Sequence, residues 1–202
     1  MIFYGASGHA KVVIEAWMAS GEKVTAIVDD DEKIKQLLGF PVVRYDPSKW
    51  ENHPMVISIG DNAARKRLAT SVKRQYGKVI HSRSIISRSA TIGEGAVIMA
   101  GAMINAETRI GCHAIINTGA VVEHDGSVGD FTHISPNATL CGGVTVGEGT
   151  QVGAGATVIP GITIGKWAVI GAGSVVTREV PDFSIVRGVP GRISGTNKKG
   201  NQ

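Results

Sequence analysis

An aliphatic residue recurs at every sixth position through the second half of the chain, and this repeat restricts the possible folds more than any other feature. Its seventeen members are Ile80, Ile86, Ile92, Ile98, Ile104, Ile110, Ile116, Val122, Val128, Ile134, Leu140, Val146, Val152, Val158, Ile164, Ile170 and Val176. A period of six fits neither an amphipathic helix, with apolar residues every three or four positions, nor an alternating strand. It is typical of hexapeptide repeats, which form the short stacked strands of a parallel β-helix.

A second period, of eighteen residues, indicates how these strands are arranged. An aliphatic residue followed by glycine recurs at this spacing, at Ile92-Gly93, Ile110-Gly111, Val128-Gly129, Val146-Gly147 and Ile164-Gly165. We therefore expect three hexapeptides per coil and a triangular prism whose interior holds the aliphatic repeat. Small residues two positions before many of its members, such as Ala96 and Ala156, let the chain turn inside each corner. A buried helix or an ordinary β-sandwich does not account for an unbroken period of six.

The residues before this repeat predict a separate α/β domain. The expected strands are residues 1–4, 24–28 and 54–60, and the expected helices are residues 10–19, 32–38 and about 62–76, the last capped by Asp61 or Asn62. Strands that alternate with helices favour a small parallel sheet of the Rossmann type. Ligands bind such sheets at the carboxyl ends of the strands.

Three loops of this domain are candidates for ligand binding because each follows a strand. Their residues are Ser7, Gly8 and His9, then Asp29 and Asp30, and then Gly60. Glycine permits close backbone approach, and free amides at a helix start attract phosphate. An acidic residue about twenty positions further on, such as Asp29, suits the hydroxyl groups of a ribose. Glycines kept for packing alone are the alternative, and a nicotinamide dehydrogenase is disfavoured because no hydride-transfer domain follows.

Charge and composition argue against several classes of partner. The net charge is +4, but the longest basic run is Arg65, Lys66 and Arg67, which we interpret as a solvated helix face. We therefore expect no nucleic-acid binding. No apolar stretch reaches the about 20 residues that span a bilayer, so no membrane insertion is expected. The two cysteines fall in different coils and no secretory signal is recognised, which favours a reduced cytoplasmic protein.

A histidine between two carboxylates is the strongest candidate for chemistry. His124 is flanked by Glu123 and Asp125. A carboxylate beside an imidazole fixes its tautomer and stabilises its protonated form, as a general base requires. His133 follows nine positions later, half a coil away, so a site that used both histidines would form between neighbouring subunits. A surface histidine beside two acids is the alternative.

A zinc site is the other function that histidines would serve on this scaffold. Three of them would have to converge on one metal ion. The spacings from His113 to His124 and from His124 to His133 are eleven and nine residues, and neither is a multiple of six that would stack the side chains on one face. We therefore expect no metal and interpret His113 as structural or solvent-facing. A zinc hydro-lyase formed through subunit contacts stays open as an alternative.

The order and spacing of these motifs resemble one family, the hexapeptide-repeat acyltransferases of the NeuD/PglD type. This group includes sialic acid O-acyltransferases and UDP-4-amino-sugar N-acetyltransferases. The resemblance covers nearly the whole chain. It rests on residues 4–9, 28–30, 57–62, 117–125, 129–133 and 186–190.

The chain is therefore expected to have three parts. Residues 1–79 form a Rossmann-like nucleotide-sugar-binding domain, residues 80–181 the β-helix, and residues 182–202 a C-terminal extension outside the repeat. The polar stretch 195–202 has no periodicity and is expected to be disordered in whole or in part. The resemblance adds that the β-helix is left-handed, an exception to the right-handed crossover rule, and that it forms a homotrimer with acetyl-CoA between adjacent prisms.

The resemblance also implies roles for individual residues. His124 matches the general base of the family, and Asp125 matches the acid that increases its basicity. Matches to acetyl-CoA contacts are His133 and the backbone of Ala154 and Ala172, and the amide of Gly142 is a candidate for stabilising an oxyanion. The residues that match nucleotide-sugar contacts are Ser7, Gly8, His9, Asp29, Asp30 and Gly60.

Four positions depart from the family pattern. Asp125 stands where some members have Glu, Gly191 and Arg192 replace Ala and Lys, and Asp61 replaces an Asn in the nucleotide loop. Arg192 keeps a positive charge suited to a CoA phosphate. Asp61 leaves the identity of the nucleotide base open.

The implied activity is acetyl-CoA-dependent N-acetylation of a nucleotide-linked 4-amino sugar for surface glycan synthesis. The sugar amine attacks the thioester while His124 removes a proton, and no covalent enzyme intermediate is needed. O-acetylation of a sialic-acid-type sugar is the nearest alternative. A trimeric zinc hydro-lyase and a non-catalytic β-helix are the alternatives from other classes.

Overall fold

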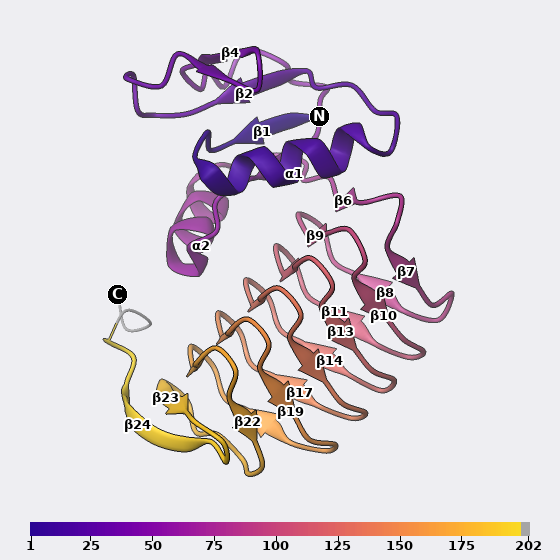
Figure 1. Cartoon of the computed structure of the whole chain (residues 1–202). Helices are drawn as coiled ribbons and strands as arrows, with labels where there is room; N and C mark the ends of the chain where they lie inside the picture. Colours follow the sequence, from indigo (N-terminus) through magenta and orange to yellow (C-terminus); the bar gives the residue numbers. More distant parts are fainter. Residues whose placement is uncertain (199–202) are drawn as a thin grey trace.

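The computed structural model describes residues 1–198 of the chain. It consists of an α/β domain, a parallel β-helix and a C-terminal hairpin (Figure 1). The coils of the β-helix stack from β6 (Val79–Ile80) to β22 (Val175–Val176), and the α/β domain lies against their side. Helix α1 (Gly8–Met18) lies between its sheet and the coils, whereas α2 (Asn62–Ser71) packs on the other face of the sheet and also contacts the coils. No helix among the described residues is long and apolar enough to cross a membrane.

The α/β domain is built on a five-stranded sheet of order β3-β4-β2-β1-β5. Its elements are β1 (Ile2–Tyr4), α1 (Gly8–Met18), β2 (Ala26–Val28), β3 (Gln36–Leu37), β4 (Phe40–Val43), β5 (Met55–Ile57) and α2 (Asn62–Ser71). Four of the strands are parallel, and β3 pairs antiparallel with β4. The predicted Rossmann-like sheet is confirmed.

Successive side chains of β1 point to opposite faces of this sheet. Phe3 packs into the core that α1 shares with the β-helix, while Ile2 and Tyr4 point to the opposite face and pack near α2. Successive strand residues face opposite sides, so a strand covered on both faces must be apolar throughout. The continuous apolar run at the start of the chain follows from this burial.

Two helices of this domain differ from the sequence prediction. The helix expected over residues 32–38 does not form, because Asp31 closes a turn by accepting a hydrogen bond from the Lys33 amide and the chain then enters the β3–β4 hairpin. The second difference is that α2 ends at Ser71 rather than near residue 76. The segment after it runs beside β5, where Met55 pairs with the backbone of Gln75 and Gly77.

The β-helix has three parallel sheets of two-residue strands. One sheet runs through β6 (Val79–Ile80), β9 (Val97–Ile98), β12 (Ile115–Ile116), β15 (His133–Ile134), β18 (Gln151–Val152) and β21 (Val169–Ile170), and the hairpin adds β23 (Ser184–Arg187) and β24 (Arg192–Thr196) to give eight strands. The six-stranded sheet has β7 (Ile85–Ile86), β10 (Met103–Ile104), β13 (Val121–Val122), β16 (Thr139–Leu140), β19 (Thr157–Val158) and β22 (Val175–Val176). The five-stranded sheet has β8 (Thr91–Ile92), β11 (Arg109–Ile110), β14 (Ser127–Val128), β17 (Thr145–Val146) and β20 (Thr163–Ile164).

Strand pairing follows the eighteen-residue period. Ile116, for example, pairs with Ile98 on one side and Ile134 on the other. The second residue of each strand points into the prism, where Ile116, Ile134 and Ile164 are completely buried. Ile80 is 37% exposed because it lies at the open end of the stack. The predicted prism with an aliphatic interior is confirmed.

The glycines of the eighteen-residue period are required by space. A Cβ on Gly111 would lie 2.6 Å from the amide nitrogen of Asp130 in the next coil, and a Cβ on Gly147 would lie 2.6 Å from that of Lys166. Real Cβ atoms do not approach backbone this closely. Glycine therefore lets consecutive coils pack at one corner of the prism.

The C-terminal hairpin includes the first residues of the polar stretch 195–202. Gly195 and Thr196 belong to β24, and the Asn197 amide donates a hydrogen bond to the Phe183 carbonyl. Pairing of β24 with β23 gives this polar segment its order, although it lacks an apolar period. Residues 199–202 lie outside the described residues.

Replacing one interior residue should destabilise the β-helix far more than replacing its outward neighbour. Ile164→Ala removes a fully buried side chain and is expected to lower the free energy of unfolding by about 2–5 kcal/mol. Thr163→Ala, on the exposed side of the same strand, is expected to change it by less than about 0.5 kcal/mol. Urea unfolding followed by circular dichroism measures both. Equal effects would show that the interior is not the main source of stability.

Candidate active site

His124 and Asp125 form an exposed ion pair at the corner between β13 and β14. His124 Nδ1 lies 2.7 Å from Asp125 Oδ2. This hydrogen bond is the main cause of a raised pKa for His124, and the negative charges of Asp125 and Glu123 act in the same direction. Because Nδ1 is engaged by the carboxylate, Nε2 is the nitrogen left for proton transfer. The pair therefore has the arrangement of a general base.

The backbone of neighbouring coils holds this pair in place. The His124 carbonyl accepts a hydrogen bond from the Gly143 amide at 2.9 Å, and the Asp125 amide donates to the Ala106 carbonyl at 2.9 Å. The imidazole lies directly over Gly142, where a Cβ would come within 2.7 Å of His124 Cε1. The position of the ring thus requires glycine in the next coil.

His133 lies elsewhere, on β15, where the eight-stranded sheet faces the α/β domain. Its Nε2 lies 2.9 Å from Asn117 Nδ2, and since an amide nitrogen only donates, Nε2 is the acceptor. Burial, followed by the positive charge of Arg65, lowers the pKa of His133 to about 4. At neutral pH this imidazole is uncharged. His124 and His133 are on different sides of one prism, as their spacing predicted.

The predicted nucleotide-binding residues gather at the carboxyl ends of β1, β2 and β5. Ser7 precedes α1, and its side chain makes no capping hydrogen bond, so it does not occupy the free amides at the helix start. His9 packs on Gly60, where a Cβ would lie 3.4 Å from His9 Cγ. The ring centroids of His9 and His133 are 5.8 Å apart. This loop therefore meets the β-helix beside His133.

His9 is itself half-buried, and its imidazole is uncharged at neutral pH. Burial is the main cause that lowers its pKa to about 4, and the charge of Arg65 adds to the effect. Its Nε2 is enclosed and has no hydrogen-bond partner within residues 1–198. A substrate atom or a water molecule beside this nitrogen would satisfy it.

The two aspartates after β2 have different contacts. Asp29 accepts hydrogen bonds from the amides of Ala6 at 2.6 Å and Asp31 at 2.8 Å, and so fixes the shape of the first loop. Asp30 accepts a hydrogen bond from the Tyr4 hydroxyl at 2.9 Å. Burial and then this carboxylate raise the pKa of Tyr4. Both aspartates line a cavity of about 390 Å³ that also contacts α2, and its lining is Tyr4, Gly5, Asp29, Asp30, Ile59, Ala64, Arg67, Leu68 and Ser71.

Ala154 and Ala172 are exposed at a different corner of the prism from His124. They are one coil apart, and the Gly173 amide donates to the Ala154 carbonyl at 2.9 Å. This corner joins the eight-stranded sheet to the six-stranded sheet, whereas the corner of His124 joins the six-stranded sheet to the five-stranded sheet. A single chain therefore does not bring these two alanines beside His124.

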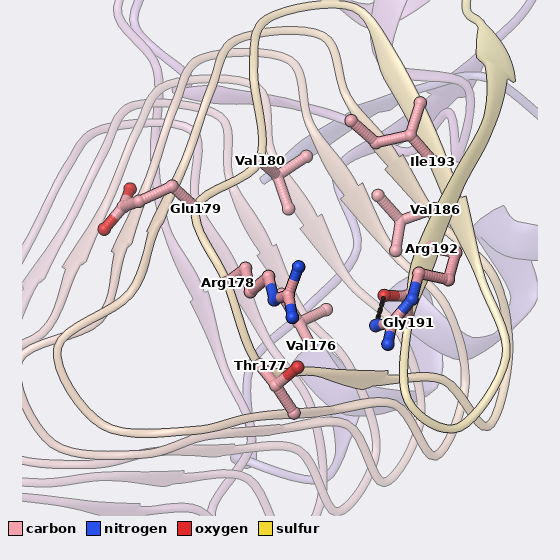
Figure 2. A pocket seen from close by; sticks show the side chains of 9 residues that line it. All are labelled: Val176, Thr177, Arg178, Glu179, Val180, Val186, Gly191, Arg192 and Ile193. Atoms are coloured by element: carbon pink, nitrogen blue, oxygen red, sulfur yellow. Dashed lines mark hydrogen bonds between the residues drawn. The ribbon is translucent and has the colours of Figure 1, made fainter.

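A cavity of about 200 Å³ lies at the C-terminal end of the β-helix (Figure 2). Its apolar residues are Val176, Val180, Val186 and Ile193. Figure 2 shows the guanidinium groups of Arg178 and Arg192 facing this space from the last coil and from β24. In the six-stranded sheet β22 is three strands beyond β13, which corresponds to about 14 Å at the usual strand spacing.

Two comparisons of sequence with family models match separate parts of the chain. Residues 1–72 match the PglD N-terminal domain. Residues 125–159 and 143–178 match the bacterial transferase hexapeptide (six repeats).

Solved structures match almost the whole chain. A histidine-to-asparagine variant of perosamine N-acetyltransferase from Caulobacter crescentus, in complex with CoA and GDP-perosamine, is 44% identical, with a TM-score of 0.92 and 96% of each chain covered. The chain belongs to the hexapeptide-repeat acetyltransferases of the NeuD/PglD type.

Other members of this acetyltransferase family show the same fold. The acetyltransferase domain of PglB from Neisseria gonorrhoeae FA1090, in complex with acetyl coenzyme A, is 33% identical, with a TM-score of 0.87, and the match covers 96% of this chain and 98% of that one. WeeI from Acinetobacter baumannii AYE is 28% identical with the same TM-score and coverage. An uncharacterised protein of Acanthamoeba polyphaga mimivirus is 32% identical over 93 residues, and this chain spans only 19% of its length.

The basic triplet on α2 of this acetyltransferase is not the solvated helix face that its sequence predicts. Of its three residues only Arg67 is exposed. Arg65 is completely buried, and Lys66 pairs with Glu148 and lies 5.3 Å from the Trp167 ring centroid. Asn62 is also buried. The sequence did carry a signal of this burial, because Asn62, Arg65 and Leu68 are spaced three residues apart and therefore share one face of the helix.

The remaining candidate metal ligands do not form a metal site. Among the described residues no three His, Cys, Asp or Glu side chains converge as a metal ion would need. His113, interpreted as structural or solvent-facing, is buried with its ring stacked 5.0 Å from that of Phe131. Cys112 and Cys141 are both free thiols.

Removing the carboxylate partner should lower the pKa of His124. Asp125→Asn replaces the charged acceptor that is the main cause of the raised value, so the imidazole should lose its proton at a lower pH than in the wild type. Glu123→Gln is the matched control and should have a smaller effect, because Glu123 acts through its charge alone. Titration of the ring protons by NMR measures both shifts. An unchanged pKa in Asp125→Asn would mean that the ion pair does not control the basicity of His124.

Proposed function

We propose that this chain is an acetyl-CoA-dependent N-acetyltransferase acting on a nucleotide-linked 4-amino sugar, with His124 as the general base. The observation that carries the proposal is the His124–Asp125 pair in a chain that is 44% identical to perosamine N-acetyltransferase over 96% of both chains. That relative was crystallised with CoA and GDP-perosamine, and also as a variant with one histidine replaced by alanine. These variants support a histidine at the centre of the reaction.

The His124 pair suits each proton movement of this reaction. The sugar amine attacks the thioester carbonyl, and His124 Nε2 takes the proton that the nitrogen loses as the C–N bond forms. Asp125 stabilises the resulting imidazolium through Nδ1. The C–S bond then breaks, and the CoA thiolate takes a proton from the imidazolium. Gly142 lies directly beneath the His124 ring, and this position supports its amide as a candidate hydrogen-bond donor to the oxyanion.

The nucleotide-sugar would bind the loops at the carboxyl ends of β1, β2 and β5. We infer a GDP-linked sugar as the first candidate, because the relative with 44% identity was crystallised with GDP-perosamine. Ser7 and Gly8 offer free amides for the diphosphate, and Asp29 and Asp30 line the neighbouring cavity with hydrogen-bond acceptors. His9 and Gly60 would contact the part of the substrate that points toward the β-helix.

Acetyl-CoA would bind between the prisms of a homotrimer. The support for this assembly is that His124 and the pair Ala154 and Ala172 occupy different corners of one prism, so that two prisms side by side would bring such corners together. We place His133 at the acetyl-CoA site and the enzyme in the cytoplasm, the compartment of both substrates. Acetylated amino sugars of this kind would then enter surface glycan synthesis.

A thiol-release assay tests the proposed reaction and its base. Wild-type protein should release CoA from acetyl-CoA in the presence of one member of a panel of GDP-, UDP- and dTDP-4-amino sugars. His124→Ala should lower kcat by about 10² to 10⁴ with the oligomer intact by light scattering. His53→Ala, at an exposed histidine of the α/β domain, is the control and should be unchanged. Near-normal kcat in His124→Ala, or a product acetylated on oxygen, would contradict the proposal.

The arginines at the C-terminal cavity are expected to anchor a CoA phosphate. The double change Arg178→Ala and Arg192→Ala should raise KM for acetyl-CoA several-fold with little change in kcat, because it removes binding charge far from the reacting atoms. Acetyl-dephospho-CoA should show a smaller difference between variant and wild type. Arg88→Ala, exposed near the other end of the β-helix, is the control. An unchanged KM would place the phosphates elsewhere.

A further inference from the structure

Arg65 is a completely buried cation at the junction of the two domains. It lies in the second turn of α2, whose first turn is capped by the Asp61 carboxylate accepting from the Ala64 amide at 2.8 Å. Within residues 1–198 no carboxylate forms an ion pair with it. A buried charge without a counter-ion is costly unless hydrogen bonds satisfy it. The buried guanidinium of Arg65 therefore needs a specific set of hydrogen-bond acceptors.

These acceptors come from both domains. On the side of the nucleotide loop, Nη1 donates to the carbonyls of Ile59 at 2.9 Å and Gly60 at 3.2 Å. On the side of the β-helix, the acceptors are also backbone carbonyls. Nε donates to the carbonyl of His113 at 2.8 Å, and Nη2 donates to the carbonyls of Phe131 at 2.9 Å and Thr132 at 3.1 Å. One planar guanidinium thus joins the loop after β5 to two successive coils.

Both ends of this bridge adjoin the proposed substrate sites. His9 packs against the backbone of Gly60, and Thr132 immediately precedes His133. The rings of His9 and His133 are 5.8 Å apart across the junction. The charge of Arg65 also lowers the pKa of both histidines, which burial has already lowered, and so helps to keep them uncharged.

Asn62 extends the same bridge by one coil. Its Oδ1 accepts a hydrogen bond from Arg65 Nη2 at 2.8 Å, and its Nδ2 donates to the carbonyls of Gly149 at 3.1 Å and Thr150 at 3.4 Å. The carbonyls of residues 113, 131 and 149 are eighteen residues apart and belong to one corner of the prism. Two side chains of α2 therefore bind three consecutive coils at the repeat spacing.

We propose that Arg65 is a positioning residue that fixes the nucleotide-sugar loop relative to the acetyl-transfer site on the β-helix. This inference rests on the proposed function. The amine belongs to a substrate held by one domain and the thioester to a substrate held by the other. A displacement of about 1 Å between reacting atoms can lower a rate by about 10². The rate of transfer therefore depends on a rigid junction, whereas the binding of each substrate does not.

Lysine cannot replace Arg65 in this role. Its single ammonium group has three donors at one point, while the guanidinium has five donors in a planar fork that reaches opposite sides. Arg65→Lys keeps the positive charge and loses the bridge. It is therefore the variant that separates positioning from charge.

The test compares transfer with the two binding steps in Arg65→Lys. Transfer to the nucleotide-sugar should fall at least tenfold in kcat, while Kd values for the nucleotide-sugar and for acetyl-CoA, from calorimetry, change less than threefold. Slow hydrolysis of acetyl-CoA, which needs only the β-helix site, should stay unchanged. Asn62→Ala should give the same separation with a smaller loss and serves as the second variant where Arg65→Lys is unstable. Lys66→Ala, which removes a partly exposed ion pair at the same interface, is the control and should stay within twofold.

Hydrogen exchange gives a readout that does not depend on activity. Arg65→Lys should increase amide exchange at residues 59–61 and 131–133 and leave the distant coils unchanged. Unchanged exchange there, or a wild-type kcat in both variants, would overturn the positioning role. Failure of the proposed function has a different signature, because wild-type protein would then show no transfer to any nucleotide-sugar while the exchange difference persisted.

Discussion

Stacking of identical coils around an aliphatic interior is the constraint on which the rest of the structure depends. Each strand has two residues, of which one enters the prism and one remains outside, and the backbone of the next coil pairs with it eighteen residues later. A single coil is not stable alone, since a two-residue strand buries too little apolar surface. Repetition supplies the burial, and it leaves the outward positions and corners free to carry function.

The proposed active site uses this freedom in a specific way. His124 and Asp125 occupy a corner where a charged pair meets water, while the aliphatic residues on both sides of them stay buried. Gly142 in the next coil makes room for the imidazole. A corner can thus change its chemistry without any change in the core, and the proposed general base keeps a fixed height along the prism.

The junction with the α/β domain follows a different physical rule. Here the eight-stranded sheet presents Val97, Ile115 and His133 in place of exposed residues, and its corner carbonyls face α2. Those carbonyls need donors when they are buried, and Arg65 and Asn62 supply them. The junction is therefore a hydrogen-bonded contact between backbone and two side chains, bordered by an apolar core.

The six-residue period determined the β-helix, its sheet register and the corner of His124, because each of these depends on local spacing alone. The strand-loop-helix pattern determined the positions of the candidate nucleotide-binding loops for the same reason. Burial of Arg65, the early end of α2 and the order of β24 were decided by tertiary structure. Each depends on which surface the segment meets, and sequence spacing within one segment does not encode a partner that lies in another domain or another strand.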